Sequence, residues 1–135
     1  NVKIKGFIDR IDKEVKTGML RIVDYKTGSV AGGELKVKDW PALITDVKYT
    51  KALQVLLYQW LYQKEKGVKE GITSGLISLR SSSGNFMPVY FDQQFGDDHL
   101  ECAVGELLSE LLSDIFNKQK PFRQTKDIKV CAFCD

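Results

Sequence analysis

The stretch that decides the fold reads Arg21-Ile22-Val23-Asp24-Tyr25-Lys26-Thr27-Gly28. Its apolar run predicts a strand, and alternate side chains of a strand point to the same face. Asp24 and Lys26 should therefore lie side by side at the end of the strand. Gly28 then lets the backbone turn away without steric cost. An acid beside an amine suits catalysis, but a surface salt bridge would give the same pattern.

The sequence before this stretch predicts a second strand that pairs with it. Residues 2–11 alternate polar and apolar side chains, which is typical of a half-buried strand, with Gly6 as a β-bulge. The polar residues 13–18 end in Thr-Gly and predict a hairpin turn, and residues 19–25 supply the returning strand. We therefore expect an antiparallel hairpin at the start of the chain.

A tight hairpin would place Asp9 beside Asp24. Two carboxylates held that close resist being ionised together unless a cation lies between them. Mg²⁺ prefers oxygen ligands and commonly combines one or two carboxylates with water and a substrate phosphate. Lys26 next to that ion could orient a water molecule or offset charge on a phosphate oxygen. The alternative for Asp9 is a solvated charge cluster with Arg10 and Asp12.

The remainder of the chain predicts two helices and a second pair of strands. In order, the pattern predicts a long connection over 27–49, a helix over 51–66 that Gly67 ends, strands over 72–79 and 86–91, and a helix over 97–117. We expect an α/β fold in which helices pack against one sheet.

Composition sets the class of protein but not its partner. The chain has 135 residues, 43% hydrophobic and 28% charged, which is the balance of a single soluble globular domain. No apolar run approaches the ~20 residues of a membrane span, and no signal peptide is visible, so we expect a cytoplasmic protein without a membrane partner. The net charge of +2 is too small to establish nucleic-acid binding. The abrupt ends suggest a fragment of a longer protein, with residues 120–135 as the start of a cysteine-bearing segment.

Three short motifs follow one another: Gly6-x-x-Asp9-Arg10-x-Asp12, Asp24-Tyr25-Lys26-Thr27-Gly28 and Gln54-x-x-x-Tyr58. Together they resemble the PD-(D/E)xK nuclease superfamily, and within it the RecB/AddB-type nuclease domain of bacterial recombination and repair. Each motif is weak alone, and the three cover the first half of the chain. The resemblance implies a restriction-endonuclease-like fold, which is a mixed sheet flanked by helices.

The resemblance also implies roles for individual residues. Asp9 and Asp24 would be metal ligands for Mg²⁺ or Mn²⁺, the backbone carbonyl of Tyr25 would complete the metal shell, and Lys26 would be the catalytic lysine. The family normally adds an acid or a histidine from a preceding helix, and no residue before Asp9 supplies one. His99 is not assigned that role, because a capping or solvent-exposed position near the start of the last helix explains it.

Gln54 and Tyr58 lie one helical turn apart and therefore share a helix face. Ordinary helix packing is one explanation for the pair. The resemblance implies instead that both are part of the site and orient the DNA strand that is cut. The neighbouring residues Gln59 and Tyr62 are expected on the helix surface.

Four lysines after the second motif could line a phosphate-binding groove, namely Lys36, Lys38, Lys48 and Lys51. In that case the affinity for DNA would fall steeply with salt. They could equally be ordinary solvating charges, and the sequence leaves both explanations open.

The cysteines carry a separate signal. Cys131-x-x-Cys134 has the spacing of half a zinc or iron–sulfur site, although a redox pair or chance would give the same spacing. In AddB-like nucleases, cysteines after the nuclease core join one before it to hold a [4Fe–4S] cluster. The resemblance therefore implies such a cluster in the full-length protein, but not an intact one here. Cys102 is expected to be a buried packing residue.

The predicted function is a metal-dependent DNA nuclease, expected to be an exonuclease, of a helicase–nuclease or related recombination or repair protein. Its partners would be DNA and a helicase domain or subunit. One alternative is a catalytically inactive DNA-binding or scaffolding module that keeps the nuclease fold. Another is a small cluster-bearing interaction domain centred on the cysteines. The complete set of two acids and a lysine favours the nuclease, although activity of the isolated fragment is not implied.

Overall fold

The computed structural model of the chain describes residues 2–92, 97–125 and 130. In these residues, four strands form a mixed sheet in the order β1-β2-β4-β5. They are β1 (Arg10–Lys13), β2 (Leu20–Lys26), β4 (Ile72–Ser78) and β5 (Met87–Pro88). β2 runs parallel to β4, whereas the two outer pairs are antiparallel. The predicted fold class, a mixed sheet with flanking helices, is confirmed.

β2 occupies the interior of the sheet because its middle is apolar on both faces. Ile22 and Val23 are fully buried, although neighbouring residues of a strand point to opposite faces. β4 beside it is also buried along most of its length. Burial on two faces is typical of parallel strands, and it makes the end of β2 a rigid support for the residues there.

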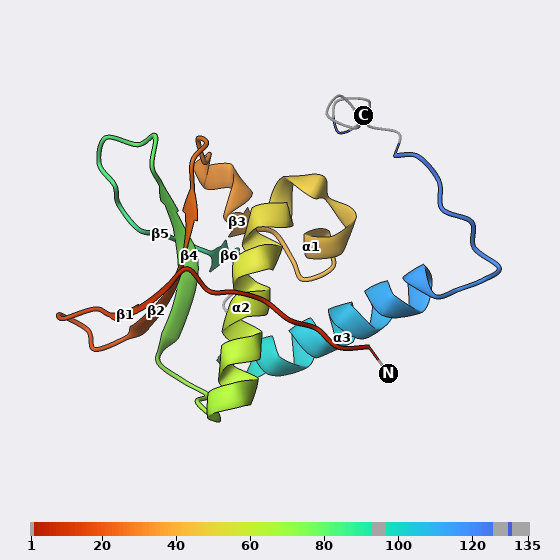
Figure 1. Cartoon of the computed structure of the whole chain (residues 1–135), viewed down its shortest axis with the longest axis horizontal. Coiled ribbons are helices and arrows are strands. Elements are labelled where there is room, and N and C mark those ends of the chain that lie inside the picture. The colour runs from red at the N-terminus through yellow and green to blue at the C-terminus, as the bar shows by residue number, and fades with distance from the viewer. Residues whose placement is uncertain (1, 93–96, 126–129, 131–135) are drawn as a thin grey trace.

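Helix α2 (Thr50–Lys66) packs against β4 and β2, as Figure 1 shows. It begins one residue earlier than predicted, and Gly67 ends it with a φ of 66°, donating its N–H to the Gln63 carbonyl. Helix α3 (Asp97–Ile115) packs in turn against α2. No helix in the described part of the chain is long and apolar enough to cross a bilayer.

The chain between β2 and β4 crosses the sheet through several short elements. They are the 3₁₀ helix η1 (Gly32–Glu34), the strand β3 (Lys36–Val37), the helix α1 (Ala42–Thr45) and the 3₁₀ helix η2 (Val47–Tyr49). The sequence predicted only a long connection here. Leu35, Val37 and Leu43 are buried in the same apolar cluster as Leu56 and Leu76. The connection is therefore a packed part of the core.

The prediction of one sheet is wrong. Among the described residues, 86–91 form two short strands rather than one, because β6 (Tyr90–Phe91) leaves β4 and pairs with β3 in a separate parallel sheet. The cause lies in the backbone. Pro88 has no N–H to donate, the Val89 N–H still reaches the Ser74 carbonyl, and the Tyr90 N–H bonds to the Leu35 carbonyl instead.

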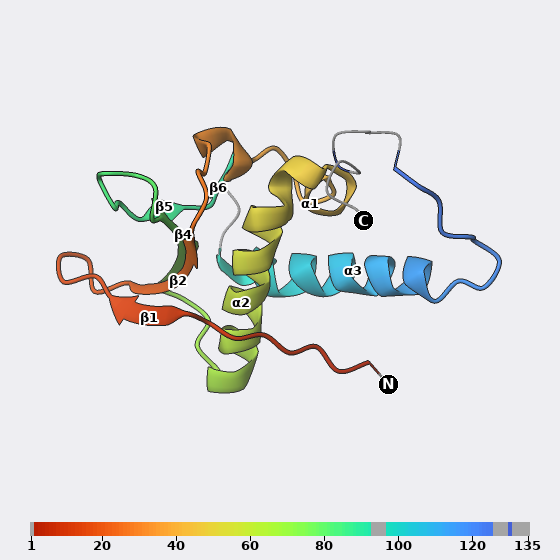
Figure 2. The same ribbon diagram turned by 45° about the horizontal axis from the view of Figure 1, so that its top comes forward.

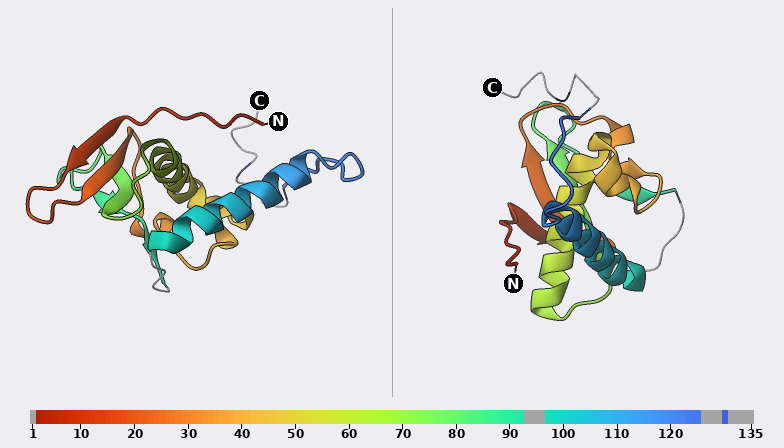
Figure 3. Two further views of the ribbon diagram at one scale, coloured as in Figure 1. Left: turned by 90° about the horizontal axis from the view of Figure 1, so that it is seen from below. Right: turned by 90° about the vertical axis from the view of Figure 1, so that its right-hand side faces the viewer.

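The predicted strand over residues 2–11 is wrong in its first part, because β1 starts only at Arg10. Residues 2–9, which we call the N-terminal segment, instead run across α2 (Figures 1 and 2). Seen from below in Figure 3, this segment and α3 lie on opposite sides of α2. Ile4 and Ile8 are half-buried between exposed neighbours. The alternation in the sequence therefore reflects packing on a helix, not pairing in a sheet.

Gly6 is not a β-bulge, since it lies outside any strand. A Cβ atom built at Gly6 would lie 2.8 Å from Cε1 of the Tyr58 ring and 3.4 Å from a methyl group of Leu61. Real Cβ atoms essentially never approach another heavy atom as closely as the first of these distances. Glycine is therefore required here for the close approach of the backbone to the tyrosine ring.

We predict that Gly6→Ala lowers stability by about 1–3 kcal/mol, the usual cost of overpacking, because the segment and the Tyr58 ring must separate. Gly32→Ala is the matched control, since no atom lies within 4 Å of a Cβ at that position. Thermal unfolding of both variants measures the difference. Equal melting temperatures for Gly6→Ala and the parent would contradict the packing of the segment on α2.

Asp12 is expected to stabilise the β1–β2 hairpin in a pH-dependent way. Its Oδ1 accepts a hydrogen bond from Arg21 Nε at 2.6 Å, and its Oδ2 lies 2.7 Å from Arg10. The bond from Arg21 is the main reason why the pKa of Asp12 lies below its usual value of 3.8. A lowered pKa gives stabilisation that is present above pH 3.8 and is lost as the pH falls through the folded-state value.

Asp12→Asn should therefore lower the free energy of unfolding by about 0.5–1 kcal/mol at neutral pH, the range for a solvent-screened ion pair. Urea unfolding at neutral pH and at a pH well below the usual pKa of an aspartate measures the effect. The difference between variant and parent should shrink in acid. An unchanged difference at the two pH values would rule out the charged pair as its source.

Candidate active site

The carboxyl end of β2 carries the charged pair that the sequence predicted on one face. Asp24 is 4% exposed, and its Oδ2 lies 2.8 Å from Lys26 Nζ. The geometry of this ion pair does not make a hydrogen bond, so Oδ2 is a buried oxygen without one. Burying a carboxylate in this state is costly. This cost makes Asp24 a candidate for a functional role.

Gln54 on α2 joins these residues into one network. Its Oε1 accepts a hydrogen bond from Lys26 Nζ at 2.7 Å, and its Nε2 donates to Asp24 Oδ1 at 3.3 Å. The same Nε2 donates to the Tyr58 hydroxyl at 2.9 Å, one helical turn further along α2. The fold thus brings Asp24, Lys26, Gln54 and Tyr58 together, because α2 lies across the end of β2.

Asp9 lies at the neighbouring edge of β2. Its Oδ2 accepts the Tyr25 backbone N–H at 2.9 Å. The antiparallel register, continued one residue beyond the pair of Arg10 and Val23, sets Asp9 opposite Asp24. Because the N–H and C=O groups of a strand residue point to the same edge, the Tyr25 carbonyl also faces this side. Asp9 is exposed and Asp24 is buried, so the two carboxylates differ in their access to solvent.

The oxygen atoms at this end of β2 suit a hard divalent cation. Asp24 offers a buried oxygen without a hydrogen bond, Asp9 offers an exposed carboxylate, and Tyr25 offers a backbone carbonyl. Mg²⁺ commonly binds one or two carboxylates and keeps water in its other positions. In the described residues, no group of three or more His, Cys, Asp or Glu side chains could hold a metal ion. A cation here would therefore depend on this small set of ligands and on water.

Ser78, which the sequence did not single out, holds the loop that follows Lys26. It is buried at the end of β4, directly opposite Lys26 in the parallel register, and its hydroxyl donates to the Gly28 carbonyl at 2.9 Å. The Lys26 carbonyl in turn accepts the Leu79 N–H at 2.8 Å. Only the pairing of β2 with β4 reveals this role, and a serine near the end of a strand gives no signal of it.

Of the four lysines expected near DNA, Lys51 lies closest to the network in sequence, one turn before Gln54 on α2. Its Nζ contacts Glu34 at 2.8 and 3.0 Å and the Ser29 carbonyl at 3.4 Å. Burial alone would raise the pKa of Glu34. The hydrogen bonds from Lys51 and from the Ala31 N–H outweigh it and hold that pKa below its usual range. Lys51 thus ties the loop after Lys26 to α2.

The contacts of the other three lysines differ from those of Lys51. Lys36 pairs with Asp92 at 3.0 Å beside the small sheet. Lys48 lies with its Nζ 5.0 Å from the centre of the Tyr49 ring, and Lys38 is exposed. A shared phosphate-binding groove for all four therefore stays a prediction.

Several other expectations are corrected or lie outside the described residues. Gln59 is not on the surface, because it is 6% exposed and donates to the Ile72 carbonyl at 3.3 Å. Cys102 is exposed on α3 rather than buried. His99 is exposed in the first turn of α3. Cys131 and Cys134 lie outside the residues that the structure describes.

A pocket of about 550 Å³ lies elsewhere, toward the start of β4. Its lining includes Arg21, Trp40, Gln59, Ser74 and Phe86. Neither Asp24 nor Lys26 contributes to it. This pocket is therefore not lined by any residue of the charged network at the end of β2.

Comparison with known proteins gives the family. The whole chain, residues 1–135, matches the model of the PD-(D/E)XK nuclease superfamily. Searches of curated proteins and of solved structures gave no significant match. The family match covers the full length, including the strand end that carries Asp24 and Lys26, and it implies nuclease activity in general and DNA as the substrate. The chain belongs to the PD-(D/E)XK nuclease superfamily.

Proposed function

We propose that the chain is the catalytic domain of a Mg²⁺-dependent deoxyribonuclease, with Mn²⁺ as an alternative metal. One observation carries the proposal: a buried Asp24 oxygen without a hydrogen bond lies 2.8 Å from a lysine amine at a strand end. Asp9 and the Tyr25 carbonyl face the same place from the neighbouring edge. These groups together can bind a hard cation and a phosphate.

Asp9, Asp24 and the Tyr25 carbonyl would hold the ion in this proposal. A bound divalent cation polarises a phosphoryl oxygen and lowers the pKa of a bound water. Lys26 positions the attacking water and offsets the negative charge that develops on the phosphate. Its amine already lies between the Asp24 carboxylate and the Gln54 amide, so its orientation is fixed before the substrate arrives.

Gln54 and Tyr58 act together on the face of α2 that meets the strand end. Gln54 holds Lys26 through its carbonyl oxygen and Tyr58 through its amide nitrogen. The Tyr58 hydroxyl accepts that bond and keeps its own proton free to donate to a phosphate oxygen of the strand being cut. We therefore assign Gln54 to positioning Lys26, and Tyr58 to orienting the DNA backbone.

The order of the three motifs supports a RecB/AddB-type domain within the superfamily. On that basis we propose an exonuclease that works with a helicase domain or subunit in recombination or repair. The alternative, an inactive module that keeps the fold, is disfavoured because Asp9, Asp24 and Lys26 are all present and the last two are held in contact. Decay of an active site would commonly have removed at least one of them.

Asp24→Asn and Lys26→Ala should each lower Mg²⁺-dependent cleavage of linear DNA by about 10²–10⁴-fold, as expected for loss of a metal ligand or a charge-stabilising group. Binding of DNA in the absence of the metal should survive in both variants. A gel assay with end-labelled DNA measures cleavage, and fluorescence anisotropy measures binding.

Asp92→Asn and Lys64→Ala are the matched controls, because both residues form exposed ion pairs away from the strand end. They should cleave as the parent does. If Asp24→Asn cleaves at the parent rate, the site assignment is wrong. If the parent shows no Mg²⁺- or Mn²⁺-dependent cleavage but binds DNA, the inactive-module alternative holds.

The cysteine pair supports a second, separate proposal for the full-length protein. Cys131 and Cys134 would supply ligands to a [4Fe–4S] cluster, which needs further ligands from elsewhere. Full-length protein purified without oxygen should be brown, with the broad visible absorption of an iron–sulfur cluster. Cys131→Ser should abolish this absorption, whereas Cys102→Ser should keep it, since Cys102 lies exposed on α3. A colourless parent protein would contradict the cluster.

A further inference from the structure

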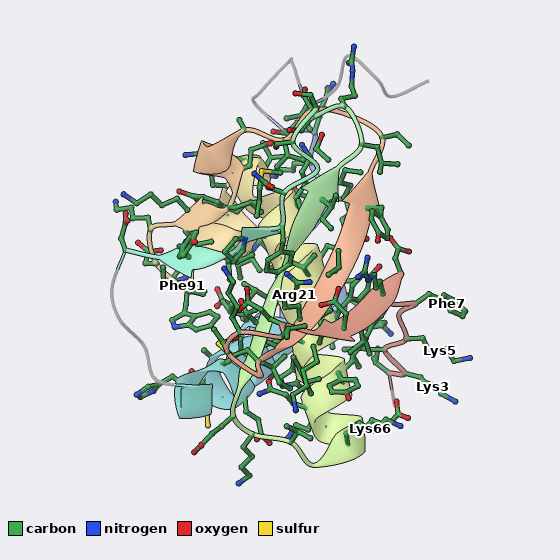
Figure 4. All side chains as sticks on the ribbon, turned by 90° about the vertical axis from the view of Figure 1, so that its left-hand side faces the viewer. Lys3, Lys5, Phe7, Arg21, Lys66 and Phe91 are labelled. Atoms are coloured by element: carbon green, nitrogen blue, oxygen red, sulfur yellow. The ribbon has the colours of Figure 1, made fainter. Side chains whose placement is uncertain are left out.

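The N-terminal segment separates its side chains by their chemistry. Ile4 and Ile8 are half-buried, and between them Gly6 fits against the Tyr58 ring. Lys3, Lys5 and Phe7 are exposed, and Figure 4 shows all three projecting from the segment away from the rest of the molecule. One side of the segment is therefore fixed on α2, while the other presents two amines and an aromatic ring to solvent.

Phe7 is the most conspicuous of these side chains, because it is 91% exposed. Burying a phenylalanine side chain stabilises a protein by about 1.5–3 kcal/mol. The exposed Phe7 ring does not contribute this free energy to folding. A single exposed apolar residue can be incidental. Here, however, the backbone that carries the ring packs on α2, since Gly6 fits against the Tyr58 ring and Ile8 is half-buried.

The two lysines have no competing partner. Among the described residues, neither Lys3 nor Lys5 forms an ion pair, in contrast to Lys26, Lys36 and Lys51. In an extended chain, residues two apart lie roughly 6.5 Å from each other on one side. That spacing is comparable with the distance between neighbouring phosphates of an extended nucleic-acid strand. Along the segment, the exposed groups are therefore, in order, two amines, an aromatic ring and the Asp9 carboxylate.

We propose that the exposed side of the N-terminal segment is a binding track for single-stranded DNA next to the active site. Lys3 and Lys5 contact phosphates, and the Phe7 ring stacks on a base. The track leads to Asp9, whose carboxylate bonds the Tyr25 backbone at the end of β2. The inference rests on the proposed DNA nuclease function for the identity of the polymer, and adds the strandedness of the DNA and the residues that hold it.

The aromatic ring is the reason for choosing a single strand over a duplex. Bases of a duplex stack on one another, so their faces are not available to a side chain. Bases of a single strand offer their faces, and stacking on an aromatic ring is insensitive to sequence. Lysine contacts alone would serve either form of DNA equally well, since they neutralise phosphates.

The test measures binding separately from cleavage. Fluorescence anisotropy with a labelled thymidine oligonucleotide, in EDTA so that no cleavage occurs, compares the parent with Phe7→Ala and Phe7→Trp. Phe7→Ala should weaken binding about ten-fold, the lower part of the range for one stacked base, and Phe7→Trp should restore it. Phe122→Ala is the matched control, since Phe122 is 85% exposed on a different part of the surface.

Two further measurements identify the contacts. On an oligonucleotide whose bases have been removed, the parent and Phe7→Ala should bind equally, because there is nothing to stack. The double variant Lys3→Gln/Lys5→Gln should reduce the slope of log affinity against log salt by about 1.4, which corresponds to two lost phosphate contacts. The exposed pair Lys13→Gln/Lys16→Gln controls for a general loss of charge.

The outcomes also separate this inference from the proposed function. If the parent cleaves DNA but Phe7→Ala and the lysine variant bind single strands as the parent does, the track is wrong and the nuclease stands. If no cleavage is found but Phe7→Ala weakens single-strand binding as described, the track stands and the nuclease fails. An equal loss of duplex and single-strand binding in Phe7→Ala would overturn base stacking. If Phe7→Ala and the lysine double variant bind DNA as the parent does but lose binding to another protein, the segment is a protein-binding surface and the track is wrong.

Discussion

The buried carboxylate of Asp24 sets the requirements that the surrounding structure meets. A carboxylate at 4% exposure needs a neighbouring positive charge, and Lys26 supplies it from the same face of the same strand. Lys26 in turn needs an acceptor to fix its amine, which Gln54 provides from a helix above the sheet. Each contact depends on the one before it. The site therefore needs three features together. These are a strand with buried faces, a lysine two residues after Asp24, and a helix that crosses the end of that strand.

The parallel pairing of β2 with β4 explains how the helix comes to be there. Two parallel strands cannot be joined by a tight turn, so the chain must cross over and return. In this protein the crossover contains α2, and it passes over the end of β2 on the way. Ser78 at the end of β4 then holds the start of the crossover through the Gly28 carbonyl. The topology that buries Asp24 is thus the same topology that brings Gln54 to it.

The sequence predicts well those elements whose pattern has one explanation. β2, α2 and β4 lie within one residue or so of the predicted ranges, because a two-faced apolar strand and a helix ended by Gly67 have few alternatives. It fails where a pattern depends on a distant partner. The alternation around Ile4 and Ile8 looks like a strand until α2 is known to lie beneath it, and the break at Pro88 depends on the position of β3.

The residues of the candidate site also differ in how well the sequence predicts them. Asp24, Lys26, Gln54 and Tyr58 could be identified from short motifs, and the structure brings them into one network. Ser78 could not be found, because its partner is a backbone carbonyl fifty residues away along the chain. Buried amides and hydroxyls that bond to the backbone leave no periodic trace in the sequence. Residues that position others are therefore harder to predict than residues that carry charge.

Asp9 differs from the rest of the site in the rigidity of its support. Asp24 and Lys26 lie on a strand that is bonded on both sides, whereas Asp9 precedes β1 at the point where the N-terminal segment leaves the sheet. The close approach of Gly6 to the Tyr58 ring, the half-buried Ile8 and the hydrogen bond from the Tyr25 N–H to Asp9 hold that segment down. Any ligand that presses the segment onto α2 would also fix the Asp9 carboxylate, while a ligand that lifts it would remove one acid from the site. In the proposed site, binding along the segment and occupancy of the metal position would therefore be coupled, because a single residue, Ile8, separates Phe7 from Asp9.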